Sequence, residues 1–141
     1  MNFDVEWSEH DLVQITTVEE LDAIIDEVKT ESVENSLPIV MTVTRSDVVD
    51  DSEFPVPYGV CVSIGHPERS YALYIGLPQG GVAVEPDLDP WPKPLLFDFG
   101  GEETEYPPTS TRLRSETATR IVREYVATGL RPTGVEWERV P

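Results

Sequence analysis

The sequence predicts an α+β fold in which two helices pack on an antiparallel or mixed β-sheet, arranged as a meander. Three observations predict it: two segments place apolar residues at helical spacing, short β-type runs lie between them, and the linkers between the central runs have four or five residues. Linkers this short join antiparallel strands, because a parallel pair needs a long crossover. The predicted order is β-α-β-β-β-β-β-α-β, in a single domain over residues 1–141.

The first strand and the first helix are predicted near the N-terminus. Over residues 2–7, apolar side chains alternate with acidic ones, which is typical of a half-buried strand. Thr17 and Glu20 match a capping box, in which each residue satisfies a backbone N–H that has no partner inside the helix. The helix is predicted from Val18 to about Glu31. Its apolar stripe comprises Val18, Leu21, Ile24, Ile25 and Val28.

The middle of the chain is predicted to supply the meander. A strand over Ile39–Arg45 precedes an acidic, proline-containing segment that is typical of a surface loop. Three β-rich runs follow, at Tyr58–Gly65, Ser70–Leu77 and Gly81–Glu85. Residues 87–94 contain three prolines in five positions, which excludes a helix or a central strand, and Leu95–Phe99 then reads as the next strand.

The C-terminal part is predicted as a loop, a helix and a last strand. Gly100–Ser110 is acidic and contains Gly and Pro, so we expect a loop. Ser115 is the predicted N-cap of the second helix. Gly129 and Pro132 form a stop signal after this helix, and Gly134–Val140 is the predicted last strand. The apolar stripe of the helix comprises Ala118, Ile121, Val122, Tyr125 and Val126.

The charge balance restricts the class of partner. Asp and Glu number 27 against 10 Lys and Arg, which gives a net charge of −17. Such a chain repels nucleic acid and anionic membranes and attracts basic surfaces, although the same composition also serves solubility alone. The single Cys61 cannot form an internal disulfide, and no apolar run approaches the roughly 18 residues of a membrane span. We therefore expect a cytoplasmic protein without a membrane partner.

The sequence contains none of the common catalytic or cofactor motifs, so we expect no catalytic residue, no cofactor and no metal. His10 has Glu6, Glu9 and Asp11 as near neighbours, which we interpret as a surface cluster at a strand end. His66 lies in a Gly-His-Pro turn, and Cys61 in an apolar run that favours burial. An enzyme that uses an acidic pair stays open as an alternative, with Glu102 and Glu103, or Asp87 and Asp89, as the candidate pairs.

The segment 97–106 is the predicted partner-binding site. A strand ends there at a flexible Gly100–Gly101 hinge, and three glutamates beside a tyrosine follow. Acidic side chains attract a basic partner from a distance, and an aromatic side chain anchors it. The alternative is a solvated hairpin loop. Trp91, held between prolines, is interpreted either as an exposed anchor or as a lid over the core, and Trp137 as a core residue. The predicted contacts are Asp98, Glu102, Glu103, Glu105, Tyr106 and Trp91.

About the last 45 residues resemble a known family. The set that carries the resemblance is Phe97-Asp98-Phe99-Gly100-Gly101, Tyr106-Pro107-Pro108, the helix 115–128, Tyr125 to Pro132, and Val135-Glu136-Trp137. In this order it resembles immunity protein family one of bacterial polymorphic toxin systems, and the N-terminal part agrees in outline. The resemblance implies a small cytoplasmic protein without catalytic residues that binds and neutralises a cognate toxin domain, frequently a nucleic-acid deaminase.

The residues and the resemblance agree on a toxin inhibitor. A deaminase that acts on nucleic acid needs a basic cleft, which an acidic protein could enter or cover. We expect an interface of about 1,600 Å² or more and an association rate that falls as salt rises. The alternative is an acidic adaptor or nucleic-acid mimic that binds another basic protein.

Overall fold

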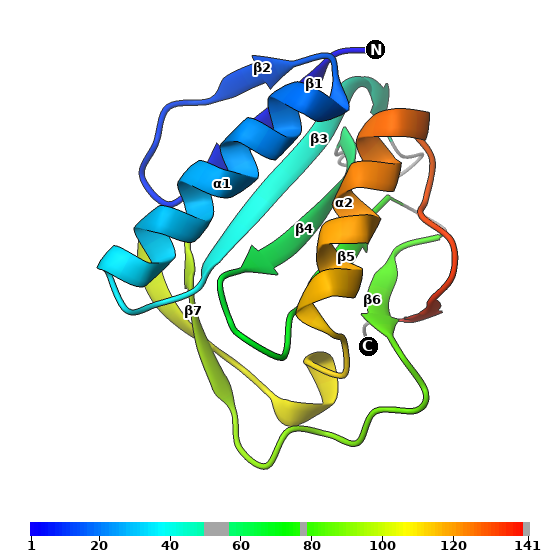
Figure 1. The fold of residues 1–141 in the computed structure, drawn as a ribbon. Helices are drawn as coiled ribbons and strands as arrows, with labels where there is room; N and C mark the ends of the chain where they lie inside the picture. The colour runs from blue at the N-terminus through cyan, green and yellow to red at the C-terminus, as the bar shows by residue number, and fades with distance from the viewer. Residues whose placement is uncertain (50–56, 77–78, 140–141) are drawn as a thin grey trace.

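The computed structural model describes residues 1–49, 57–76 and 79–139, and it confirms the predicted α+β class. Two helices lie on one face of a mostly antiparallel sheet, with α1 along β1 and β3 and α2 along β4 and β5 (Figure 1). The elements in chain order are β1 (Phe3–Trp7), β2 (Val13–Ile15), α1 (Val18–Glu34), β3 (Ile39–Val49), β4 (Pro57–Ile64), β5 (Ala72–Ile75), β6 (Gly81–Val84), β7 (Leu95–Phe99), β8 (Glu102–Tyr106), the short 3₁₀ helix η1 (Pro108–Ser110), α2 (Ser115–Thr128) and β9 (Glu136–Glu138).

The strand order in the sheet is β2-β1-β3-β4-β5-β6-β9, and every neighbouring pair along this path is antiparallel. The two remaining strands leave this path. β7 touches β3 through one parallel bridge between Ile39 and Asp98, and β8 pairs with β7 in antiparallel register. The sheet is therefore mixed, which is one of the two predicted possibilities.

The main core lies between the sheet and the helices. Both predicted stripes are buried there, with Val18 partly so. Tyr125 of α2 is fully buried and meets Phe3 edge-on, with ring centroids 5.5 Å apart. Trp137 packs against this cluster from β9, as predicted, and remains partly exposed. Complete burial of an apolar side chain such as that of Phe3 contributes roughly 1.5–3 kcal/mol to the stability of the fold.

A second cluster lies on the opposite face of the sheet. Successive residues of a strand point to opposite faces, so Met41 joins the main core while its neighbour Val40 faces the other way. The second cluster is covered by the β7–β8 hairpin and comprises Val40, Cys61, Leu95, Phe97 and Tyr106. Since β4 is covered on both faces, its sequence is almost continuously apolar rather than alternating.

The two helices differ in how they begin. The capping box of α1 is confirmed: the Glu20 N–H donates to Thr17 Oγ1 at 3.1 Å, and Glu20 Oε1 accepts from the Thr16 N–H. The N-cap prediction for α2 is wrong, because Arg114 occupies that position and Ser115 is the first helical residue. The Ser115 hydroxyl instead donates to the carbonyl oxygen of His66 at 2.7 Å, which docks the helix on the β4–β5 loop.

The predicted stop signal after α2 is confirmed. Gly129 is the C-cap in the left-handed region, with φ of 71°, and its N–H donates to the Tyr125 carbonyl. This backbone conformation is the one that favours glycine, because a side chain is strained there. The Pro132 carbonyl that follows accepts the indole N–H of Trp137 at 2.9 Å.

Several strand boundaries differ from the prediction. β2 and β8 were not predicted, and β8 replaces much of the predicted loop Gly100–Ser110. β3 continues through Asp47 to Val49, into the predicted loop, whose remainder at 50–56 lies outside the described residues. β5 and β9 are shorter than their predicted runs, and the ends of those runs at Leu77 and Val140 also lie outside the described residues. α1 extends one turn beyond Glu31.

Candidate partner-binding surface

The predicted acidic loop is a regular β-hairpin. Phe99 pairs with Glu102, which leaves Gly100 and Gly101 as a two-residue turn. Both glycines have positive φ, 64° and 93°, as the turns that fit the twist of a hairpin require. The prediction of a loop is therefore wrong for Glu102–Tyr106, which is a strand. Two glycines between β-type runs are themselves a hairpin signal, in line with the alternative prediction of a hairpin loop.

The register divides the hairpin into two faces. The pairs Leu95–Tyr106 and Phe97–Thr104 lie on the face that turns toward the sheet, while Leu96–Glu105 and Asp98–Glu103 lie on the outer face. Glu103 and Glu105 are accordingly exposed, and Glu102 is exposed beside the turn. Three of the six predicted contacts thus stand in solvent on a rigid element.

Asp98 holds the hairpin in place. Its Oδ1 accepts the Gly101 N–H at 2.8 Å, which closes the turn, and its Oδ2 accepts the Ser8 hydroxyl at 2.9 Å, which ties the turn to the end of β1. Its backbone N–H donates to the Pro38 carbonyl. The Asp98 carboxylate is therefore occupied by contacts within the chain.

Tyr106 packs inside the molecule. Its side chain is only 9% exposed, and its ring lies 5.2 Å from that of Phe97 and 4.7 Å from that of Tyr71. This burial raises the pKa of Tyr106 to about 12.

The exposed apolar side chains of the hairpin are instead Leu96 and Phe99, which are 45% and 48% exposed and which the sequence analysis did not select. The Gly-Gly turn fixes the register that would have identified Leu96 as outward-facing.

Trp91 is separate from the hairpin turn. The Arg69 guanidinium lies 5.1 Å from its ring centroid, and the His66 ring meets it edge-on at 5.5 Å. Half-buried, it packs against the second cluster, in agreement with the interpretation as a lid. The hairpin turn contacts Ser8, whereas Trp91 contacts the β4–β5 loop.

A small hollow adjoins the hairpin turn. Its volume is about 110 Å³, and it lies between β1, β3 and the turn. Glu6, Thr42 and Phe99 are among its lining residues, so a carboxylate and an aromatic ring flank a partly polar floor. Its size suits one side chain of a partner.

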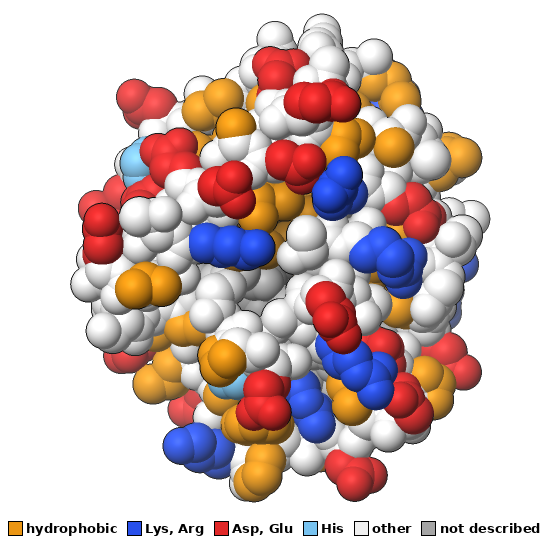
Figure 2. Space-filling view, viewed as in Figure 1, with side chains coloured by type: hydrophobic (Ala, Val, Ile, Leu, Met, Phe, Trp, Pro, Cys, Tyr) orange, Lys and Arg blue, Asp and Glu red, His pale blue; other side chains and the backbone are white. Residues whose placement is uncertain are grey.

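Many of the basic side chains are used within the molecule. Arg114 binds Glu85 and Asp87 at 2.6 Å each, and Arg45, Arg120 and Arg123 also pair with carboxylates. Among the described residues, none of the ion pairs involves Glu102, Glu103 or Glu105. Acidic side chains are frequent over α1, and several basic side chains lie over α2 (Figure 2). The hairpin acids are thus free for an external cation.

Comparison with known proteins decides the family. A family model described as "Immunity protein Imm1" matches residues 9–139. The chain belongs to the Imm1 immunity protein family. The match includes α1 and the meander, so the resemblance extends well beyond the last 45 residues. No curated protein and no solved structure matches the chain. Membership of an immunity protein family implies that the chain neutralises a cognate toxin.

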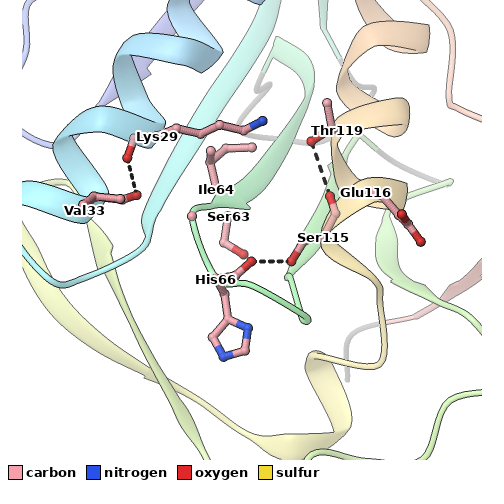
Figure 3. A pocket seen from close by; sticks show the side chains of 10 residues that line it. Lys29, Val33, Ser63, Ile64, His66, Ser115, Glu116 and Thr119 are labelled. Carbon is pink, nitrogen blue, oxygen red and sulfur yellow. Dashed lines mark hydrogen bonds between the residues drawn. The ribbon is translucent and has the colours of Figure 1, made fainter.

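A hollow between the two helices of this Imm1 protein holds several polar side chains that are engaged within the chain. It has a volume of about 380 Å³ and lies between α1 and α2 above the end of β4, with Lys29 and Glu116 among its lining residues (Figure 3). The Ser115 hydroxyl donates to the His66 carbonyl, and the buried Ser63 hydroxyl shares a 2.8 Å hydrogen bond with Ser70. Both hydroxyls therefore serve packing contacts.

The other candidate groups for chemistry are also engaged in structure. Cys61 is buried, which raises the pKa of its thiol, and it lies 3.4 Å from the Thr42 hydroxyl. Glu102 and Glu103 are consecutive strand residues whose side chains point to opposite faces, so they do not converge as an acid–base pair. Hydrogen bonding to Arg114 lowers the pKa of Asp87. None of the helices in the described ranges is long and apolar enough to cross a bilayer.

In the structure, the acidic neighbours of His10 differ from those that the sequence analysis named. Its Nε2 lies 2.7 Å from Glu31 Oε1 on α1, and Glu27 is the third member of this group, in place of Glu6, Glu9 and Asp11. Desolvation raises the pKa of Glu31, but hydrogen bonds from Trp7 and His10 and the charge of His10 outweigh it, so the net pKa is lowered. Both carboxylates come from α1. They lie too far from His10 along the chain for sequence spacing to reveal that the three residues meet.

Proposed function

We propose that this Imm1 protein binds a cognate toxin domain and neutralises it without catalysis, with the β7–β8 hairpin as part of the interface. The observation that carries the function is the family match over residues 9–139. The hairpin supports the location, because it presents three exposed carboxylates on a rigid element beside exposed apolar side chains.

The proposed partner is a toxin domain with a basic surface, of the nucleic-acid deaminase class. Such an enzyme holds a polyanionic substrate in a positively charged cleft. A protein with a net charge of −17 complements that cleft and competes with the substrate for it. The inhibitor itself then binds neither nucleic acid nor membrane, and acts in the cytoplasm.

The hairpin residues have different roles in the proposed binding of the toxin. Glu102, Glu103 and Glu105 attract the basic partner, and Leu96 and Phe99 supply apolar contact at short range. The hollow beside Phe99 accommodates one side chain of the toxin, and a Lys or Arg fits its Glu6 carboxylate and aromatic wall. Asp98 and Tyr106 act indirectly, by holding the turn and the inner face of the hairpin. Trp91 contacts the toxin only if the interface, about 1,600 Å² in a standard complex, extends to the β4–β5 loop.

Charge reversal on the hairpin tests this proposal. Replacing Glu102, Glu103 and Glu105 together by Lys weakens binding to the toxin domain of the neighbouring gene by more than about tenfold, because attraction becomes repulsion. The measurement is the dissociation constant of the purified pair, together with survival of cells that co-express both. The matched control replaces Asp26, Glu136 and Glu138 by Lys, at three exposed positions on α1 and β9. Its dissociation constant is expected to stay within a fewfold of the wild-type value.

Two results would contradict the proposal at different levels. Unchanged affinity of the hairpin variant, with a folded protein, removes the hairpin from the interface while toxin inhibition stands. Failure of the wild-type protein to bind or protect, combined with binding to an unrelated basic protein, favours the acidic adaptor instead.

A further inference from the structure

Three potential metal ligands converge on the surface between the β1–β2 connection and α1. His10 comes from the connection, and Glu27 and Glu31 come from one face of the helix, four residues apart. One ligand atom from each lies within 4.8 Å of the other two. Ligand atoms around a tetrahedral ion with bonds of about 2.1 Å lie roughly 3.4 Å apart. Small rotamer changes of exposed side chains therefore suffice to close the group around an ion.

The two glutamates carry like charges at neighbouring positions of one helix face. Carboxylates at positions i and i+4 of a helix repel each other by a few tenths of a kcal/mol. In the described part of the chain, Glu31 has His10 as its ion-pair partner, and no Lys or Arg pairs with either glutamate. A divalent ion would compensate both carboxylates at once.

A residue outside the group holds two of its members in position. The Trp7 indole N–H donates to Glu31 Oε2 at 3.0 Å, which leaves Oε1 directed at His10. The Trp7 ring also stacks on the imidazole, with centroids 4.6 Å apart and planes inclined by 27°. Trp7 is only 4% exposed, so this support belongs to the rigid core. Metal sites commonly have such outer contacts, because they orient the ligands before the ion arrives.

We propose that His10, Glu27 and Glu31 form a binding site for a divalent transition-metal ion, with Zn²⁺ as the best match. One imidazole nitrogen and two carboxylates are a ligand set that Zn²⁺ accepts, and water completes the coordination on the exposed side. The imidazole is 40% exposed and the Glu31 side chain 23%, so an ion reaches the group from solvent. Bound metal would clamp the β1–β2 connection to α1.

Zinc titration of the full chain, stripped of metal with a chelator, tests the site. Calorimetry is expected to show saturable 1:1 binding, and His10→Ala and Glu27→Gln each to weaken it by at least about tenfold. Asp26→Asn is the matched control, since it removes one exposed carboxylate of the same helix outside the group and retains wild-type affinity. The chain has two histidines, so in NMR spectra zinc shifts the His10 ring signals and leaves those of His66 in place.

The site is refuted if the wild type shows no saturable zinc binding, or if His10→Ala binds as tightly as the wild type. Shifts of His66 in place of His10 would also overturn it. Each of these readouts uses the isolated protein and zinc alone, so their outcome is independent of toxin binding.

Discussion

His66 shows how a residue that could be a catalyst is committed to structure. Its Nδ1 accepts the backbone N–H groups of Glu68 and Arg69, at 3.1 and 2.9 Å, and so closes the β4–β5 loop. Its carbonyl receives the Ser115 hydroxyl at the start of α2. Protonation of Nδ1 would replace two favourable contacts by repulsion between donors. The neutral ring is therefore the form that the fold requires.

The stability of the protein should depend on pH through His66. Desolvation lowers its folded-state pKa below the ordinary value of about 6.5; the charge of Glu68 opposes this shift and that of Arg69 adds to it. The unfolded chain then binds the proton more tightly, so the contribution of His66 is full above about pH 6.5 and declines as pH falls below it. We expect the free energy of unfolding, measured with urea between about pH 7.5 and pH 5.5, to fall on acidification.

His66→Asn is the matched variant for this measurement. Its amide oxygen can accept the same backbone N–H groups but does not titrate. The decline of stability with acidification should be smaller in this variant. Equal declines in both proteins would assign the effect to other groups.

At the scale of elements, the β7–β8 hairpin has one face buried against the sheet and one face exposed to solvent. Phe97 is fully buried against the sheet, whereas its neighbour Leu96 points into solvent beside Glu105. The two-glycine turn and the Asp98 contacts hold this division in place. A shift of the strand register by one residue would turn Leu96 toward the sheet and Phe97 toward solvent. The turn must therefore fix a single register.

Two alanine substitutions on β7 should separate these faces. Phe97→Ala is expected to lower the free energy of unfolding by about 3–5 kcal/mol, because it leaves a cavity between hairpin and sheet. Leu96→Ala should change it by less than about 0.5 kcal/mol and weaken toxin binding instead. Denaturant unfolding of both variants checks the first effect. A large loss of stability in Leu96→Ala would contradict the assigned register.

At the scale of the whole molecule, the charge is distributed unevenly. Of the 27 acids, 23 lie within residues 1–105, while several arginines of α2 and its flanks are paired with carboxylates. A net charge of −17 opposes compaction through self-repulsion. The same excess favours solubility, and it would also favour the basic partner that we propose.

Salt should therefore stabilise the isolated protein. Raising NaCl from about 20 mM to about 500 mM shortens the Debye length from tens of ångströms to a few and screens the repulsion. The replacement of Glu102, Glu103 and Glu105 by Lys changes the net charge by +2 at each position, from −17 to −11, and should reduce the response. Thermal unfolding at both salt concentrations measures it. Stability that falls with salt would show that ion pairs such as Arg114–Glu85 outweigh the repulsion.

Prediction from sequence succeeded where the cause is local. The stripes of α1 and α2, the Thr17 capping box and the Gly129 stop depend on residues within a few positions of each other, and all are confirmed. β2 and β8 were missed because three mostly exposed residues, and a run of glutamates, become strands only through pairing with a neighbour. Of the predicted contacts, Glu102, Glu103 and Glu105 are exposed, as a contact must be, but Tyr106 is buried and Asp98 closes a turn.

The chain alone is thus sufficient for the α+β class, the helices, the acidic character and the resemblance to the Imm1 family, since each follows from composition or near neighbours. Long-range packing decides which side chains face outward. It turns an apparent acidic loop into a hairpin with Leu96 and Phe99 exposed, and it brings His10 to two glutamates of a helix. These contacts join residues far apart in the chain, and no short-range pattern encodes such distances.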